Sequence, residues 1–252
     1  MNYNWHWKVL LETEPGGTGT YLHYLIVGLG WTLATALAAW VIALAIGALV
    51  GTLRTTPIKW VVRAGNLYVE IFRNVPLIVQ MFLWFFVFPE FLPKALGDWI
   101  KQMPPPWASY IPAVLCLGIF TSVRVAEQVR AGINSLPRGQ RMAGTAMGLT
   151  EAQAYRYVIL PQAFRIILPP LTSEFMNVIK NSSVALTIGL LELTGRARAM
   201  QEFSFRVFEA FTAATVIYLL TNLIVVLAMR ALEKKVRVPG LIAAAGAPQA
   251  GH

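Results

Sequence analysis

Charged side chains lie inside the apolar stretches of this sequence, where ionised groups are costly. Arg124, Glu127 and Arg130 follow one another at three-residue spacing among mostly apolar neighbours. On a helix this spacing places them on one side, so the carboxylate can pair with either guanidinium. Ionisable groups in such surroundings normally face a partner or a polar cavity. We therefore expect Glu127 and Arg130 to belong to buried ion pairs that lock spans or subunits together, with a partner available at helical spacing.

Glu70 and Arg73 form a second charged pair, again three residues apart. The same helical geometry predicts a local ion pair between them. If the helix continues, Arg73, Gln80 and Trp84 share one face, which makes Gln80 a candidate for a polar pathway. A structural role for the two charges is the favoured interpretation.

A third group is centred on Glu174. Its helical neighbours Asn177 and Asn181 share its face, with Lys180 at the edge. We expect Glu174 and Lys180 to be intramembrane charges paired within the protein. Asn181 and Ser182 stand where this helix is expected to end, and two roles stay open for them. They either satisfy backbone groups freed at the helix end or contact a polar substrate.

Arg124 differs from the other charges because Glu127 can fully satisfy only one of its two arginine neighbours. A guanidinium fork that is partly free matches a carboxylate better than an ammonium does. Our hypothesis is that Arg124 contacts the carboxylate of a substrate, and the alternative is a purely structural pair.

The elements that hold these charges must be membrane-spanning helices. Charged residues make up only 13% of the chain and hydrophobic ones 56%, whereas soluble domains carry about 25% charged residues. No charge occurs over residues 24–53, 102–123 or 210–229. Each block is long enough to cross a hydrocarbon core about 30 Å thick. The sequence predicts an all-α, polytopic membrane protein.

We expect about five spans and a short helix in the membrane interface. The spans lie near residues 24–50, 65–89, 109–134, 155–180 and 207–231, and the interfacial helix lies in the Pro- and Trp-rich segment 89–107. Residues 182–193 are apolar but too short to cross, which is typical of a half-helix or re-entrant piece. Pro169 and Pro170 are expected to kink or interrupt the fourth span.

Lysine and arginine are concentrated after the first, third and fifth spans. By the positive-inside rule these links are cytoplasmic, so the N-terminus is periplasmic and the C-terminus cytoplasmic. The chain then divides into an N-terminal periplasmic tail (1–20), a transmembrane domain (21–238) and a flexible cytoplasmic tail (239–252).

The third link, residues 136–161, begins as a short amphipathic segment with several small residues. Small side chains allow close approach by another protein. Gly148 is expected to end this first helix, and Thr150 to cap the next one. From composition alone, an ordinary cytoplasmic connector is the favoured interpretation.

The pattern of this link resembles the coupling motif of permease subunits of ATP-driven (ABC-type) importers. That motif is an E-A-A segment, a later glycine and a distal I-x-L-P. Met142, Ala143 and Gly144 stand at the E-A-A positions, Gly148 at the glycine, and residues 159–161 at the distal part, so the acidic residue is missing at Met142. The resemblance implies a coupling helix that docks on the ATPase, with these docking residues: Gly139, Met142, Ala143, Gly144, Gly148, Leu149 and Pro161.

Further segments are similar to permeases for polar amino acids. They are EIFRNVPLIVQ (70–80), VAEQVRAGI (125–133) and VIKNSSVALTIGLLEL (178–193). The T-Y-L-x-x-x-x-x-G at 20–28 and the E-x-K-V-R-x-P-G at 233–240 resemble the glutamate/aspartate subclass. An arginine at position 124, where related permeases often have an aromatic or small residue, fits a dicarboxylic substrate. Glutamine, histidine or arginine as substrate is the alternative.

The resemblance also implies the partners and the location. They are a second, homologous permease (more readily a different chain than a copy), a dimeric ATP-binding subunit, a periplasmic amino-acid-binding protein and membrane lipid, in the bacterial inner membrane. ATP and magnesium would be used by the ATPase, with no cofactor bound by this chain. Which permease holds the substrate site is left open.

Other classes of protein fit less well. The sequence has no G-x-x-x-x-G-K-[ST] phosphate loop, so ATP hydrolysis by this chain alone is not expected. The three histidines lie at or near the ends, and neither a metal cluster nor a nucleophile–base spacing is visible. The net charge of +9 is carried at the ends of apolar blocks rather than on a nucleic-acid-binding stripe. A secondary transporter or a membrane assembly protein stays as an alternative.

Overall fold

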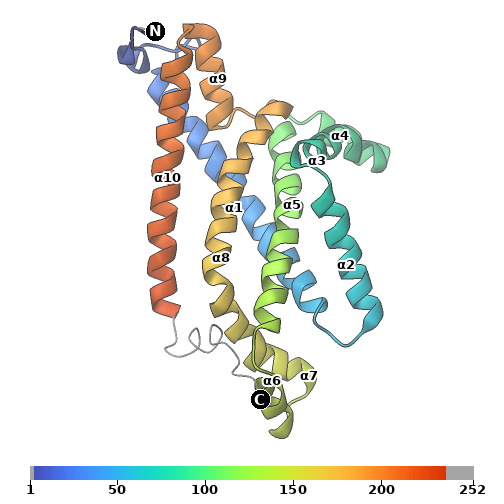
Figure 1. Ribbon diagram of the computed structural model, residues 1–252. Helices are drawn as coiled ribbons and strands as arrows, with labels where there is room; N and C mark the ends of the chain where they lie inside the picture. The colour runs from blue at the N-terminus through green and yellow to red at the C-terminus, as the bar shows by residue number, and fades with distance from the viewer. Residues whose placement is uncertain (1–2, 237–252) are drawn as a thin grey trace.

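The computed structural model describes residues 3–236, and within them the regular elements are helical. Figure 1 shows long helices side by side, with the N-terminus at one end and α6 and α7 at the other. The elements are η1 (Trp7–Leu11), α1 (Tyr21–Leu53), α2 (Lys59–Asn74), α3 (Leu77–Phe82), η2 (Leu83–Val87), η3 (Phe88–Phe91), α4 (Lys94–Lys101), α5 (Trp107–Asn134), α6 (Arg138–Ala146), α7 (Glu151–Ala154), η4 (Tyr155–Ile159), α8 (Leu160–Asn181), η5 (Ser182–Ile188), α9 (Leu193–Ser204) and α10 (Val207–Val236). The predicted tail 239–252 lies outside the described residues.

The helices α1, α5 and α10 are each long and apolar enough to cross a membrane. They confirm the first, third and fifth predicted spans as elements. The predicted fourth span is the continuous helix α8, which lies between α10 and α5 in Figure 1. It carries Arg165, Glu174 and Lys180 and does not reach the hydropathy of the other three. The predicted interfacial helix is present as α4, and the direction of the chain across the membrane stays a prediction.

The second predicted span is not one straight helix. The helix α2 and the segment 77–91 meet at a bend of 100°. Val75 is extended (φ −98°, ψ 126°) because Pro76 follows it, and a residue before proline is disfavoured in the helical region. The prediction that Arg73, Gln80 and Trp84 share one helical face is therefore wrong, since the break separates Arg73 from the other two.

Glycines bring α1 and α5 into close contact. A Cβ atom on Gly47 would lie 2.5 Å from Val125 Cβ, and one on Gly51 would lie 2.7 Å from the carbonyl oxygen of Ala126. On the other helix, a Cβ on Gly118 would lie 2.8 Å from Ile42 Cβ. Membrane helices associate through van der Waals packing, and small residues permit this approach. The pair α1–α5 thus forms the centre of the fold.

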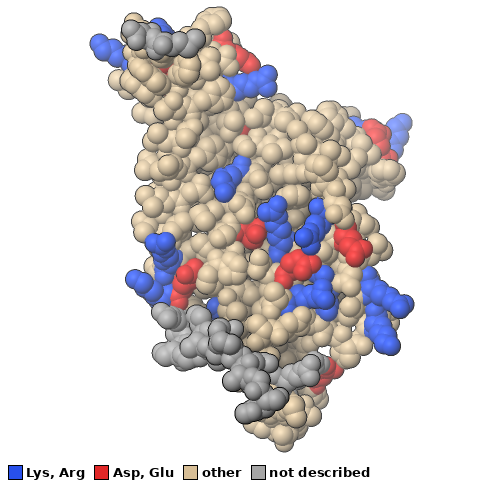
Figure 2. All heavy atoms as spheres, in the orientation of Figure 1, with Lys and Arg blue, Asp and Glu red and all other residues tan. Residues whose placement is uncertain are grey.

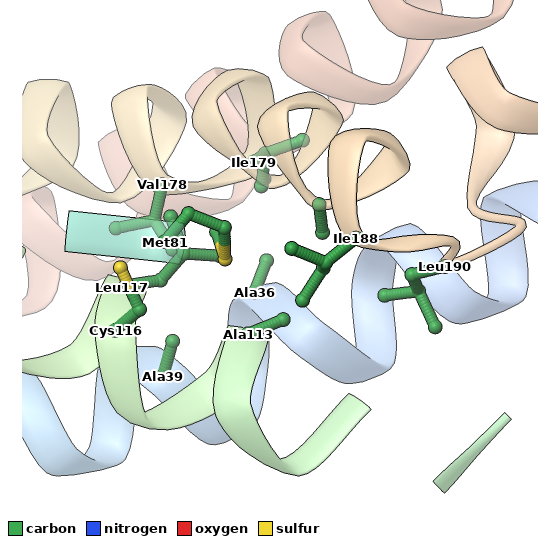
Figure 3. Close-up of a cluster of buried hydrophobic side chains, with 11 residues drawn as sticks. Ala36, Ala39, Met81, Ala113, Cys116, Leu117, Val178, Ile179, Ile188 and Leu190 are labelled. Atoms are coloured by element: carbon green, nitrogen blue, oxygen red, sulfur yellow. The ribbon is translucent and has the colours of Figure 1, made fainter. Parts of the chain in front are cut away.

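The buried core extends from this pair to α3, α8 and η5. Figure 3 shows Ala36 and Ala39 of α1 facing Cys116 and Leu117 of α5, with Met81 of α3 above them. Val178, Ile179, Ile188 and Leu190 close the cluster from the other side. The short 3₁₀ element η5 confirms a half-helix after the fourth span, and Gly189 ends it with φ +85°.

Two prolines, Pro169 and Pro170, do not interrupt α8. Pro169 and Pro170 lie inside a helix that stays continuous from Leu160 to Asn181, so the predicted interruption is absent. The irregularity lies earlier, in the π-helical turn Tyr155–Ile159. Pro161 is the second residue after that turn, and its ring and missing N–H disfavour an ordinary α-helical turn before it. A π turn accommodates the proline without ending the helix.

The N-terminal residues of the predicted tail 1–20 contact the start of α10. The backbone N–H of His6 donates to Glu209 Oε1 at 2.7 Å, and the Tyr3 hydroxyl donates to Glu209 Oε2. Val9 of η1 is buried against the start of α1, α9 and α10. Thr20 then caps α1 by accepting the N–H of His23 at 3.3 Å.

Candidate functional site

A polar cavity lies between α2, α5 and α8, the three helices that carry the charged groups identified in the sequence. It measures about 550 Å³ and is lined by Phe72, Arg73, Phe120, Val123, Arg124, Glu127, Gln128 and Glu174. Charged side chains gather on this face of the molecule in Figure 2. Tertiary packing therefore collects one charge from α2, two from α5 and one from α8 at a single opening. The volume lies within the range of pockets that hold small ligands.

Arg124 faces Glu174 across this cavity. Its Nη1 lies 3.6 Å from Glu174 Oε2, and its guanidinium carbon lies 5.3 Å from the centre of the Phe120 ring. The arginine side chain is 46% exposed and the glutamate side chain 13%. Glu174 Oε2 is buried and accepts no hydrogen bond from the described residues. The pair is loose, and the arginine stays open to the cavity.

Glu127 pairs with Arg54, at the C-terminal end of α1, and not with the arginines of its own helix. Arg54 Nη1 lies 2.9 Å from Glu127 Oε1, and Arg54 Nε donates to Asn66 Oδ1 at 2.8 Å. That Nη1 directs no N–H at an acceptor, so its contact with Glu127 is one of charge. The expected pairing within the trio at 124–130 is therefore wrong. The partner of Glu127 comes from the end of another helix, α1, and residue spacing within α5 does not reveal it.

The other predicted intramembrane charges are exposed or partly exposed. Glu70 and Arg73 are both exposed, and no ion pair joins them. Arg130 and Lys180 have no carboxylate within ion-pair distance among residues 3–236. Of these four, only Arg73 lines the cavity. The ion-pair role predicted for Glu70, Arg73, Arg130 and Lys180 is thus not observed in the described part of this chain by itself.

Three predicted pathway residues bond to the backbone or stand apart from the cavity. Gln80, 2% exposed, donates through Nε2 to the carbonyl oxygens of Phe72 at 2.8 Å and Val75 at 3.0 Å. The Ser182 hydroxyl donates to the carbonyl oxygen of Ile179 at 2.8 Å. Asn181 does not line the cavity either. Gln80 and Ser182 therefore satisfy carbonyls released at helix ends, which was one of the two interpretations for Ser182.

The third link folds into α6 and α7 beyond the ends of the long helices (Figure 1). Gly148 adopts φ +78° just after the last residues of α6, so the first helix of the link ends there, as expected. Thr150 accepts the N–H of Gln153 at 3.3 Å, and Gln153 Oε1 accepts the N–H of Thr150 at 2.9 Å, which confirms the predicted cap. The link is therefore a compact pair of helices.

Part of the α6 surface is exposed and uncharged. Met142 is 70% exposed, and Gly139 and Ala143 are exposed with it. Gly144 faces the other way: a Cβ there would lie 3.4 Å from Ala154 Cβ of α7. The predicted docking residues thus divide into an outward set, also containing Gly148 and Pro161, and an inward or partly buried set formed by Gly144 and Leu149.

A buried carboxylate precedes α9, at the end of the molecule away from α6, and the sequence analysis did not predict its role. Glu192, fully buried, accepts the N–H of Gly195 at 2.8 Å and the Tyr218 hydroxyl at 2.9 Å. Thr32 of α1 also donates to it, at 3.3 Å. Burial raises the pKa of Glu192, while these donors favour its charged form. An acidic residue just before a helix was the available signal, since such residues cap N-termini.

The chain matches the family model described as "Binding-protein-dependent transport system inner membrane component" over residues 43–238. It is 48% identical over 241 residues to the glutamate/aspartate import permease protein GltJ of Escherichia coli (strain K12), covering 95% of this chain and 98% of that protein. The glutamine transport system permease protein GlnP of the same organism is 32% identical over 215 residues, covering 85% and 93%.

The chain is also similar to solved structures of ABC transporters. An amino acid ABC transporter crystallised with histidines matches with a TM-score of 0.71 at 31% identity, covering 85% of this chain and 95% of that one. An inward-facing form of the MetNI methionine ABC transporter matches with a TM-score of 0.72 at 21% identity, covering 86% and 98%. The second likeness concerns the fold alone.

Proposed function

Because the chain belongs to the family of binding-protein-dependent transport system inner membrane components, we propose that it is the pathway-forming permease of an ATP-driven importer for glutamate and aspartate. The protein is a multi-pass component of the bacterial inner membrane. The single observation that carries the substrate class is the cavity with two arginines and two glutamates between α2, α5 and α8.

The charges of this cavity complement an acidic amino acid. Such a substrate carries two carboxylates and one ammonium, and the cavity offers the guanidinium groups of Arg73 and Arg124 together with the carboxylates of Glu127 and Glu174. Arg124 suits one carboxylate because its fork is open, and Glu174 suits the ammonium because its Oε2 lacks a donor. Substrate binding then exchanges a 3.6 Å contact for two shorter charge-assisted hydrogen bonds.

The same charges call for a partner in the membrane. Arg73, Arg124 and Glu70 are exposed on one face of the single chain, and ionised groups facing lipid are costly. A second, homologous permease packed on this face would enclose the cavity and exclude lipid from it. Residues such as Glu70 and Arg73 would then find partners across that interface.

We assign energy coupling to α6, at the end of the molecule. The exposed face of α6, with Met142 and Ala143, fits a groove in a dimeric ATP-binding subunit that uses ATP and magnesium. At the usual acidic position the side chain is Met142, so docking here rests on apolar packing. A surface ion pair contributes about 1 kcal/mol or less, so its absence is tolerated. Substrate would arrive on an external amino-acid-binding protein.

The test is ATP hydrolysis and uptake by the reconstituted complex of this chain, its permease partner, the ATPase and the binding protein. We expect glutamate and aspartate to stimulate both activities. The variant Arg124→Gln should raise the half-saturating substrate concentration about tenfold or more, since a hydrogen bond to a charged group contributes about 1.5–3 kcal/mol. Arg198→Gln is the matched control, because Arg198 pairs with Glu202 on α9, outside the cavity.

Three results would contradict parts of the proposal. Unchanged half-saturation in Arg124→Gln would remove this arginine from the substrate site. Stimulation by glutamine, histidine or arginine, and not by glutamate, would replace the substrate class and leave the importer assignment intact. Uptake that persists without the ATPase would indicate a secondary transporter.

A further inference from the structure

A second cavity lies between α8 and α10, and apart from α8 it is lined by other elements than the polar cavity. It measures about 250 Å³ and is lined by Arg165, Leu168, Pro169, Arg230, Glu233, Lys234 and Val236. The last turns of α10 form one wall, so the cavity stands at the height where a candidate membrane span ends. Basic side chains at this end of α10 are visible in Figure 2.

The cavity carries an excess of positive charge. Arg165, Arg230 and Lys234 are exposed, and none has a carboxylate within ion-pair distance among the described residues. The one acidic group, Glu233, accepts a hydrogen bond from the Thr172 hydroxyl at 3.0 Å. This bond turns the carboxylate towards α8. Three cations therefore share one opening without a compensating ion pair.

The walls and approach of this cavity are apolar. Leu168 and Pro169 line it from α8. On α10, Leu223 and Leu227 are about half exposed and stand two turns and one turn, respectively, before Arg230 on the same side of the helix. An apolar track thus leads along the span to a cationic end, and a molecule that matches it has an anionic head and a long apolar chain.

We infer that the cavity between α8 and α10 binds the phosphate headgroup of an anionic phospholipid. The phosphate accepts hydrogen bonds from Arg165, Arg230 and Lys234, and the acyl chain runs along the exposed apolar face of α10. Basic pockets between membrane helices bind anionic headgroups in this way, and each nearby lysine or arginine adds about fivefold to the affinity. The inference does not depend on which substrate the polar cavity binds.

Native mass spectrometry of the purified full-length complex tests this. Phosphatidylglycerol or phosphatidylcholine is titrated into the delipidated complex, and the fraction that retains lipid is measured. We expect tighter retention of phosphatidylglycerol. The triple variant Arg165→Gln, Arg230→Gln, Lys234→Gln should lose about fivefold in affinity for each cation removed.

The control variant Lys59→Gln, Arg63→Gln, Lys235→Gln has the same net charge and no residue of the cavity. It should retain phosphatidylglycerol as the wild type does. Equal loss in both triple variants would show attraction by net charge alone and overturn the inference, as would equal retention of both lipids by the wild type. Displacement of the lipid by inorganic phosphate at equal concentration would also overturn it. If the first triple variant does not assemble, Lys234→Gln alone should weaken retention about fivefold, and an unchanged affinity in that single variant would count against the site.

Discussion

Gly47→Ala tests the contact at the centre of the fold. The added methyl carbon would lie 2.5 Å from Val125 Cβ and 2.7 Å from the carbonyl oxygen of Ser122. Neither neighbour can rotate away, because one is a backbone atom and the other is fixed to the backbone. The helices α1 and α5 must therefore separate. Overpacking of this kind costs about 1–3 kcal/mol, and each kcal/mol lowers the melting temperature of a chain of this size by about 2–4 °C.

The matched control is Gly30→Ala on the same helix, where no heavy atom lies within 4 Å of the new carbon. Alanine is the better helix former by about 0.8–1 kcal/mol, so this variant should melt at the wild-type temperature or slightly above. Thermal unfolding of the purified complex in one detergent, followed by intrinsic fluorescence, gives both values. If Gly47→Ala melts with Gly30→Ala, the close approach of α1 and α5 is wrong.

Two further substitutions probe the links between helices. Arg54→Gln should destabilise the chain by about 1–2 kcal/mol, less than a fully buried pair would, because the Glu127 side chain is 37% exposed. Adding Glu127→Gln should recover part of that loss in a thermal melt, and additive losses would show that the two charges do not interact. Tyr155→Phe removes the bond from the tyrosine hydroxyl to the carbonyl oxygen of Thr55, 2.9 Å long, and should cost about 0.5–1.5 kcal/mol. If this bond ties the third link to the end of α1, substrate moved per ATP should also fall, and a wild-type ratio would limit its role to stability.

The long spans could be predicted because their signal is local. Residues 24–53 and 210–229 contain no charge, and α1 and α10 follow. The cap at Thr150 and the end of α6 at Gly148 were equally readable, since each depends on one residue's own conformation or hydrogen bonds. The bend at Val75 was missed although Pro76 signals it, because residues 65–89 were predicted to form one continuous span.

The partners of the charges could not be predicted, because helical spacing describes only one helix at a time. Arg54 was counted as one of several basic residues flanking the first span, yet it is buried and reaches Glu127 on α5. Glu174 was grouped with the polar residues of its own helix, yet it faces Arg124 on α5. Both pairs depend on how the helices cross: Gly47 and Gly51 bring α1 against α5, and Gly132 brings α5 against Ile167 of α8.

The two charge pairs of α5 differ in a way that assigns their roles. Arg54 has a side chain only 4% exposed, contacts Glu127 at 2.9 Å and is held by Asn66 as well. A ligand that displaced Glu127 would leave a buried cation with one partner fewer, which is strongly unfavourable. Arg124 contacts Glu174 at 3.6 Å and is open to the cavity, so a ligand carboxylate can replace that contact at little cost. Arg54 and Arg124 carry the same charge but have different roles. Arg54, at the end of α1, holds two helices together, whereas Arg124, on α5, is free to bind an acidic substrate.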